Sequence, residues 1–195
     1  MTTARTRLVC ATTATAAAVT LALFTPAAQA ENTGTAAKGT TTAASTVTLK
    51  FDKNQKHASY SKLSVIKGTK VWANFRAGSG TTQDECESEH GWLPNGTYTI
   101  RSHSRTYNGD LIKGYAIRLS DKVCSNGRTN RDSLFIHSEM NRNGSQGSPE
   151  PRQWTDNNPN DFLSKGCIKM QPEKIKELFR LLDRIGWPKT LKVVN

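Results

Sequence analysis

The pattern of apolar and polar positions becomes regular at residue 46. Val47-Thr48-Leu49-Lys50-Phe51 alternates with a period of two, which is typical of a strand with one buried face. Further short runs of β-branched and aromatic residues follow, separated by polar loops and by turn signals such as Pro94-Asn95-Gly96. We therefore predict strands at 47–51, 63–66, 71–75, 97–101, 115–119, 134–136 and 191–194.

One stretch near the C-terminus has helical spacing instead. Its apolar residues recur three and four positions apart and would form a single stripe: Ile175, Leu178, Phe179, Leu182 and Ile185. Pro172 suits the first turn of such a helix, and Gly186 is a natural stop after it. The sequence thus predicts a mainly β domain, a β-sandwich with one C-terminal amphipathic helix, rather than a βαβ arrangement.

The segment before residue 46 has a different composition. Residues 1–30 combine Arg5 and Arg7, an apolar stretch and the small-x-small site Ala28-Gln29-Ala30, which predicts a secretory signal peptide and an extracytoplasmic protein. The apolar stretch is shorter than the roughly 20 residues of a membrane span, so we expect no stable membrane insertion after cleavage. Residues 31–45, rich in Thr and Ala, are predicted to be a flexible spacer before a domain at 46–195.

Charge narrows the range of partners. The formal net charge is +11, and loss of the two leader arginines would leave +9. Such a balance favours an anionic wall polymer or membrane surface as partner. The basic residues are scattered singly and form no nucleic-acid motif, so we do not predict nucleic-acid binding.

Cysteine usage separates one thiol from the others. Cys10 lies in the predicted leader, which leaves an odd number in an oxidising compartment. Cys86 and Cys124 have polar, loop-like surroundings, whereas Cys167 follows a glycine and precedes an apolar residue. We predict a Cys86–Cys124 disulfide and a free Cys167.

A free cysteine in a tight turn is a candidate nucleophile. Gly166 permits close approach of a carbonyl substrate, and nearby backbone N–H groups can stabilise an oxyanion. The nucleophile also needs a base. His137 ends the apolar run 134–136, so a sheet would hold it rigidly, while the other three histidines lie in polar contexts. We predict a Cys167 thiolate of low pKa that depends on His137; an ordinary half-buried His137 is the alternative.

Three stretches resemble a known family. They are Ile136-His137-Ser138, the later Ser164-Lys165-Gly166-Cys167-Ile168-Lys169-Met170, and the upstream Leu93-Pro94-Asn95-Gly96-Thr97-Tyr98-Thr99-Ile100. In this order they are similar to the signature of the L,D-transpeptidase catalytic domain (YkuD-like), over roughly residues 93 to 175. Residues 46–92 match only in strand pattern. The resemblance implies an L,D-transpeptidase-like β-sandwich.

The resemblance also implies a reaction on peptidoglycan stem peptides. Cys167 would attack the bond between a diamino acid at stem position three and D-Ala, and an amine would resolve the thioester. His137 would act as general base and acid, oriented by Ser138 or by a backbone carbonyl, with Gly166 and Cys167 as oxyanion donors. Ser164, Lys165 and Lys169 would contact substrate, Lys169 standing where the family often has Arg. No metal or organic cofactor is implied.

The sequence departs from the family in the interval between His137 and Cys167, which is 30 positions and longer than usual. We interpret the Asn- and Pro-rich segment 141–163 as a lid or rim with Trp154 in contact with substrate; a disordered surface excursion is the alternative. Two other functions stay open. One is an L,D-carboxypeptidase or endopeptidase on the same scaffold, and the other is a non-catalytic wall-binding or inhibitory protein with an inert Cys167.

Overall fold

The computed structural model describes residues 45–147, 154 and 157–195. The predicted signal peptide and the predicted spacer up to residue 44 lie outside the described residues, as do 148–153 and 155–156 of the predicted lid. Within the described part of the chain, no helix is long and apolar enough to cross a membrane.

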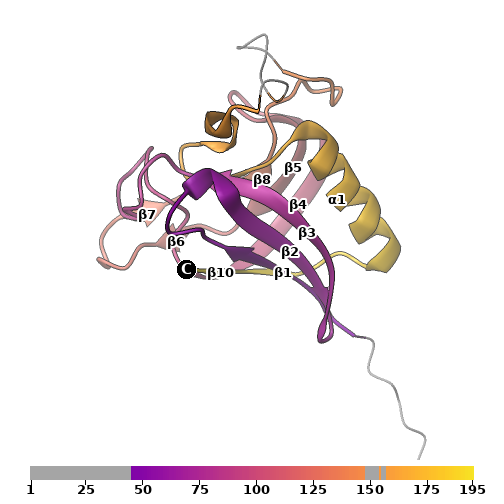
Figure 1. The fold of residues 1–195 in the computed structure, drawn as a ribbon, viewed down its shortest axis with the longest axis horizontal. Helices are drawn as coiled ribbons and strands as arrows, with labels where there is room; N and C mark the ends of the chain where they lie inside the picture. Colours follow the sequence, from indigo (N-terminus) through magenta and orange to yellow (C-terminus); the bar gives the residue numbers. More distant parts are fainter. Residues whose placement is uncertain (1–44, 148–153, 155–156) are drawn as a thin grey trace, which may run out of the picture. The chain divides into compact units, whose positions relative to one another are not determined.

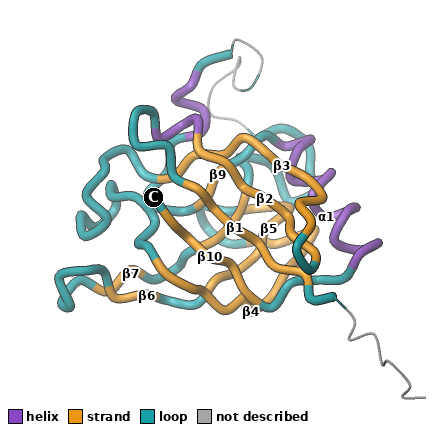
Figure 2. Tube along the Cα trace, turned by 60° about the horizontal axis from the view of Figure 1, so that its bottom comes forward, coloured by secondary structure: helices purple, strands orange, loops and turns teal. Residues whose placement is uncertain are grey.

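Strands form a closed barrel (Figures 1 and 2). The β1/β10 and β8/β9 pairs are parallel, and the other neighbours in the barrel are antiparallel. The order round the barrel is β1 (Val47–Asp52), β10 (Thr190–Val194), β4 (Gly96–Asn108), β5 (Lys113–Leu119), β8 (Phe135–His137), β9 (Ile168–Lys169), β3 (Lys70–Ser79) and β2 (Ser61–Lys67).

Two long strands join the two sheets of the predicted sandwich. The first part of β4, residues 96–99, pairs with β10, and the remainder pairs with β5. Similarly, β3 pairs with β2 through residues 70–77 and with β9 through Gly78 and Ser79. Because each long strand passes from one sheet to the other, the sandwich closes at both edges.

The core lies inside this barrel and under the helix α1 (Pro172–Ile185), whose bounds are those predicted. The alternating pattern of β1 buries Val47, Leu49 and Phe51, as the period of two requires. Leu178 and Phe179 of α1 belong to the same apolar cluster. The mainly β fold with one C-terminal helix is therefore confirmed.

Short elements escaped the sequence analysis because two to four residues carry no period. They are the 3₁₀ turns η1 (Ala58–Tyr60) and η2 (Pro159–Phe162), and the strands β6 (Lys122–Val123), β7 (Asn130–Arg131) and β9. The β6–β7 hairpin and α1 lie on opposite sides of the barrel in Figure 1. The predicted Cys86–Cys124 disulfide is present beside this hairpin, and Cys167 is free.

Candidate active site

Strand register brings the predicted nucleophile and base to one pocket. In the parallel pair β8/β9, Ile136 lies opposite Ile168, and both side chains are fully buried in the core. Side chains alternate along a strand, so the neighbours on either side point the other way. These neighbours line a pocket of about 550 Å³: Phe135, His137, Cys167 and Lys169.

The turn before Cys167 is organised by the Ser164 hydroxyl. Ser164 Oγ accepts hydrogen bonds from the backbone N–H groups of Gly80 and Gly166, both at 3.1 Å, and donates to the Cys167 carbonyl at 2.6 Å. The Gly166 N–H, a predicted oxyanion donor, is therefore engaged within the turn. The Cys167 N–H has no hydrogen-bond partner among the described residues, and it remains available to an oxyanion.

A buried arginine packs against the same turn. Arg131 is only 4% exposed, and in the described structure its guanidinium contacts backbone carbonyls and no carboxylate. These carbonyls belong to Glu85, Gly91, Trp92 and Lys165. Gly166 has φ +112°, and a Cβ there would lie 2.1 Å from Arg131 Nη2, so only glycine fits.

Ser79 holds the next carbonyl of the turn. This residue, at the end of β3, is 2% exposed. Its hydroxyl donates to the Gly166 carbonyl at 3.0 Å and accepts from the Leu93 N–H at 3.0 Å. Sequence reasoning missed both Ser79 and Arg131 because neither stands in a local motif; the carbonyls of the Cys167 turn that they hold are 87 and 34 positions away.

Both members of the predicted catalytic pair are neutral at pH 7. The Cys167 thiol donates to the Ser133 carbonyl at 3.6 Å, and burial raises its pKa to about 11. Removal from water lowers the pKa of His137 to about 4, outweighing the hydrogen bond from its ring to the Ser138 carbonyl, which raises it. The predicted low-pKa thiolate is therefore wrong for this resting state, because desolvation outweighs the hydrogen bond and the Arg131 charge that lower the pKa of Cys167.

The hydrogen bond of His137 determines which ring nitrogen can act as a base. Nδ1 lies 3.0 Å from the Ser138 carbonyl oxygen, and a carbonyl can only accept. Nδ1 therefore carries the proton of the neutral ring, and Nε2 has a free lone pair. The Ser138 carbonyl makes this contact; the buried Ser138 hydroxyl has no partner among the described residues.

Lys169 and Trp154 lie together at the edge of the site. The ammonium group of Lys169, a largely buried residue, pairs with Glu139 at 2.5 Å and lies 5.6 Å from the centre of the Trp154 ring. The backbone N–H of Trp154 donates to Asp161 Oδ2 at 2.7 Å, and the Trp154 ring packs edge-on against Phe162. Lys169 thus lines the pocket while its ammonium group is paired with the Glu139 carboxylate.

The family of the chain follows from comparison with known sequences. The model of the L,D-transpeptidase catalytic domain (YkuD) matches residues 46–194. The chain belongs to this family. No curated protein matches the sequence.

Solved L,D-transpeptidase structures are similar at low identity. L,D-transpeptidase 1 of Mycobacterium tuberculosis has 15% identity and a TM-score of 0.42, covering 77% of this chain and 62% of that one. A second M. tuberculosis L,D-transpeptidase has 15% identity, a TM-score of 0.46 and coverages of 77% and 58%. The L,D-transpeptidase of Mycobacterium smegmatis has 17% identity and a TM-score of 0.44, covering 77% of this chain and 59% of that one. The chain spans less than two thirds of the length of each.

The sequence-predicted site residues of this L,D-transpeptidase domain fall into two groups. Those that line the pocket are Cys167, His137, Ser138, Ser164, Lys165 and Lys169. Gly166 lies behind the nucleophile, and Trp154 stands outside the lining of this pocket as the structure describes it. Lys165 pairs with Glu89 at the exposed rim. No group of three or more His, Cys, Asp or Glu in the described ranges could hold a metal ion.

Proposed function

We propose that this protein is a secreted cysteine L,D-transpeptidase that acts on peptidoglycan stem peptides through a thioester acyl-enzyme. One observation carries the proposal: in a chain of this family, a free cysteine on a turn held by hydrogen bonds shares a pocket with a histidine whose Nε2 can accept a proton. Nucleophilic acyl transfer requires this combination of nucleophile, base and oxyanion donor.

The first half-reaction transfers the donor stem to the enzyme. The Cys167 thiol gives its proton to Nε2 of His137 as the sulfur attacks the carbonyl carbon between the diamino acid and D-Ala. The oxyanion that forms is stabilised by the Cys167 N–H. Collapse breaks the peptide bond, and D-Ala leaves with the proton held by the imidazolium.

The second half-reaction releases the stem to an acceptor. An amine attacks the thioester, His137 takes the amine proton, and the sulfur leaves as a thiolate that recovers the proton from His137. The neutral resting pair favours proton transfer coupled to attack, because a thiolate formed beforehand would be desolvated in the pocket.

The positive charge supports retention at the cell wall. A protein with a formal net charge of +11 is attracted to anionic polymers over about one Debye length. We expect the protein to co-sediment with purified walls at low ionic strength and to be released by moderate salt. Retention that is independent of salt would contradict this electrostatic account.

Incubation with tetrapeptide muropeptides, followed by mass spectrometry of the products, tests the reaction. Cross-linked dimers with release of D-Ala support transpeptidation. Tripeptides alone would indicate L,D-carboxypeptidase activity and contradict the proposed acceptor. An unchanged substrate would favour the non-catalytic alternative.

Matched histidine variants make the test specific. His137→Gln removes the base, and we expect it to reduce turnover by about 10²- to 10⁴-fold. His90→Gln alters an exposed histidine outside the pocket lining and should leave turnover unchanged. Equal activity of the two variants would refute the proposed role of His137.

A further inference from the structure

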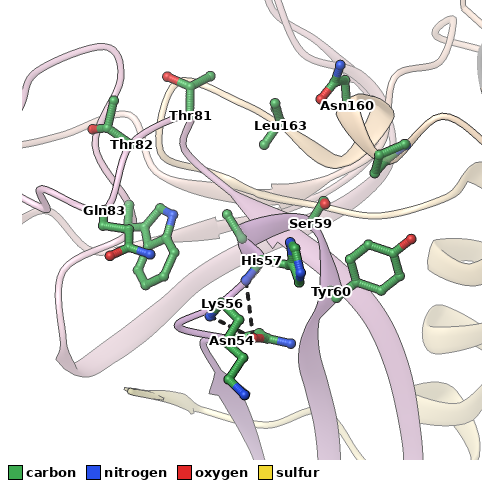
Figure 3. Close-up of a pocket in the computed structure, with 13 residues that line it drawn as sticks. Asn54, Lys56, His57, Ser59, Tyr60, Thr81, Thr82, Gln83, Asn160 and Leu163 are labelled. Atoms are coloured by element: carbon green, nitrogen blue, oxygen red, sulfur yellow. Dashed lines mark hydrogen bonds between the residues drawn. The ribbon is translucent and has the colours of Figure 1, made fainter.

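A second pocket adjoins the catalytic pocket. It has a volume of about 700 Å³, and Leu163 lines both pockets. Its walls come from the β1–β2 connection with η1, from the segment after β3, and from η2. Figure 3 shows His57, Ser59 and Tyr60 on one side of this space and Thr81, Leu163 and Asn160 on the other.

The lining of this second pocket is polar, aromatic and almost uncharged. Amide and hydroxyl side chains alternate with rings, as in Asn54, Tyr60, Thr81, Gln83 and Trp92. Among the described residues of the lining, Lys56 is the one charged side chain and none carries a carboxylate. Such a surface offers many neutral hydrogen-bonding groups and few fixed charges.

Several of these polar groups lack a partner within the described structure. The Ser59 hydroxyl and the exposed side chain of Asn160 make no hydrogen bond with other described residues. The indole N–H of Trp92, a residue 2% exposed, is buried and unpaired in the described structure. Polar groups that are free at the wall of a pocket are available to a ligand.

We propose that the second pocket binds a sugar ring of the glycan strand that carries the stem peptide. The inference rests on the proposed function. Sugar hydroxyl and acetamido groups both donate and accept hydrogen bonds, which suits the free groups of Ser59 and Asn160. The apolar faces of the ring suit the Tyr60 ring, which is 50% exposed. A four-residue stem spans roughly 13 Å when extended, so the sugar and the scissile bond fit adjoining pockets.

Other ligand classes suit this lining less well. An anionic wall polymer would need several cations, and Lys56 is alone. A cationic peptide would need a carboxylate, and the lining has none. A hydrophobic peptide would leave the amides and hydroxyls unpaired, at an energetic cost.

Binding can be tested apart from catalysis. A Cys167→Ala protein is titrated with the trimer of N-acetylglucosamine by calorimetry, with and without the added pair Ser59→Ala and Asn160→Ala. We expect saturable binding, and we expect the added Ser59→Ala and Asn160→Ala substitutions to raise the Kd at least tenfold. The pair Ser102→Ala and Asn195→Ala, which alters exposed residues without side-chain hydrogen bonds, should leave the Kd unchanged. Absence of binding, or equal binding by all three proteins, would overturn the site.

Kinetics then separate this site from the proposed function. A disaccharide-linked tetrapeptide is compared with the sugar-free tetrapeptide as donor. We expect the Ser59/Asn160 pair to raise KM about tenfold for the sugar-linked donor and to leave KM unchanged for the free peptide. Equal effects on both donors would overturn the sugar site. If the unaltered protein turns over neither donor, the transpeptidase proposal is refuted. The calorimetric result would still show whether the second pocket binds the sugar.

Discussion

Arg131 is a single residue that connects the turn before Cys167 to distant segments of the chain. Its guanidinium donates to the Lys165 carbonyl at 3.2 Å and to the Gly91 carbonyl at 3.0 Å, and it fills the space beside Gly166. A fork of donors can serve several carbonyls at once, whereas an ammonium group cannot hold the same geometry. Arg131 is therefore a positioning residue for the Cys167 turn.

Substitution of Arg131 should alter turnover more than substrate binding. We expect Arg131→Met to lower kcat by about 10²-fold with little change in KM, because displacement of the nucleophile by about 1 Å has that effect. Arg131→Lys should recover part of the loss and keep the thiol pKa lower than in the Met variant, since the Arg131 charge lowers it. The exposed Arg118→Met serves as control. Equal kcat in Met and Lys variants would contradict a positioning role.

The protonation state of Cys167 predicts how the thiol reacts. With a pKa of about 11, the thiol is almost wholly protonated at pH 7. The rate of alkylation by iodoacetamide should then rise about tenfold per pH unit from pH 7 to pH 10, because the thiolate is the nucleophile. Mass spectrometry of the peptide with Cys167 measures the rate. A rate that is constant from pH 6 to pH 9 would indicate a thiolate–imidazolium pair instead.

At the scale of elements, the disulfide restrains the segment around Glu85, whose carbonyl accepts a hydrogen bond from Arg131. Cys86 follows Glu85, whose backbone carbonyl accepts from Arg131 and whose carboxylate accepts from the Asn95 and Ser125 N–H groups. The bridge joins this segment to the turn of the β6–β7 hairpin, across a sequence separation of 38. The hairpin, the bridge and the nucleophile turn therefore form one connected unit.

Removal of the bridge should cost stability. We expect Cys86→Ser with Cys124→Ser to lower the free energy of unfolding by about 4 kcal/mol, because a loop of this length gains that much entropy in the unfolded chain. Urea unfolding of the double variant measures the loss. The same variant should also lower kcat, since the Arg131 partners become mobile. Unchanged stability would show that the loop is held by its hydrogen bonds alone.

Long elements were predictable and very short ones were not. The β1 alternation and the α1 stripe are local patterns of five residues or more, and both were confirmed. By contrast, β9 has only two residues and is a strand because it lies between β3 and β8. Its existence depends on contacts with chain segments some 30 and 90 residues away, which no local period records.

At the scale of the whole molecule, the half-buried His137 links stability to pH. Its folded pKa of about 4 lies below an unfolded value of about 6.5. Between these values the unfolded chain binds more protons, so stability is complete above about pH 6.5 and is lost as the pH falls towards 4. The contribution is about 3 kcal/mol at most.

Comparison of histidine variants isolates this contribution. Urea unfolding at pH 7 and pH 4.5 should show a larger loss for the unaltered protein than for His137→Gln, which no longer has this titrating group. His90→Gln should behave like the unaltered protein because His90 is exposed. An identical pH dependence for all three proteins would contradict the lowered pKa of His137.

The sequence by itself determined the strand and helix periods, the unpaired thiol and the choice of Cys167 and His137 as candidate reactive residues. Each of these depends on residue type and near-neighbour spacing, as in the run that ends at His137 and the glycine before Cys167. Only the tertiary structure decided the environment of those residues. Burial makes Cys167 and His137 neutral, and Ser79 and Arg131, distant in sequence, hold the turn. Desolvation and long-range hydrogen bonds depend on how the whole barrel closes, which no local pattern contains.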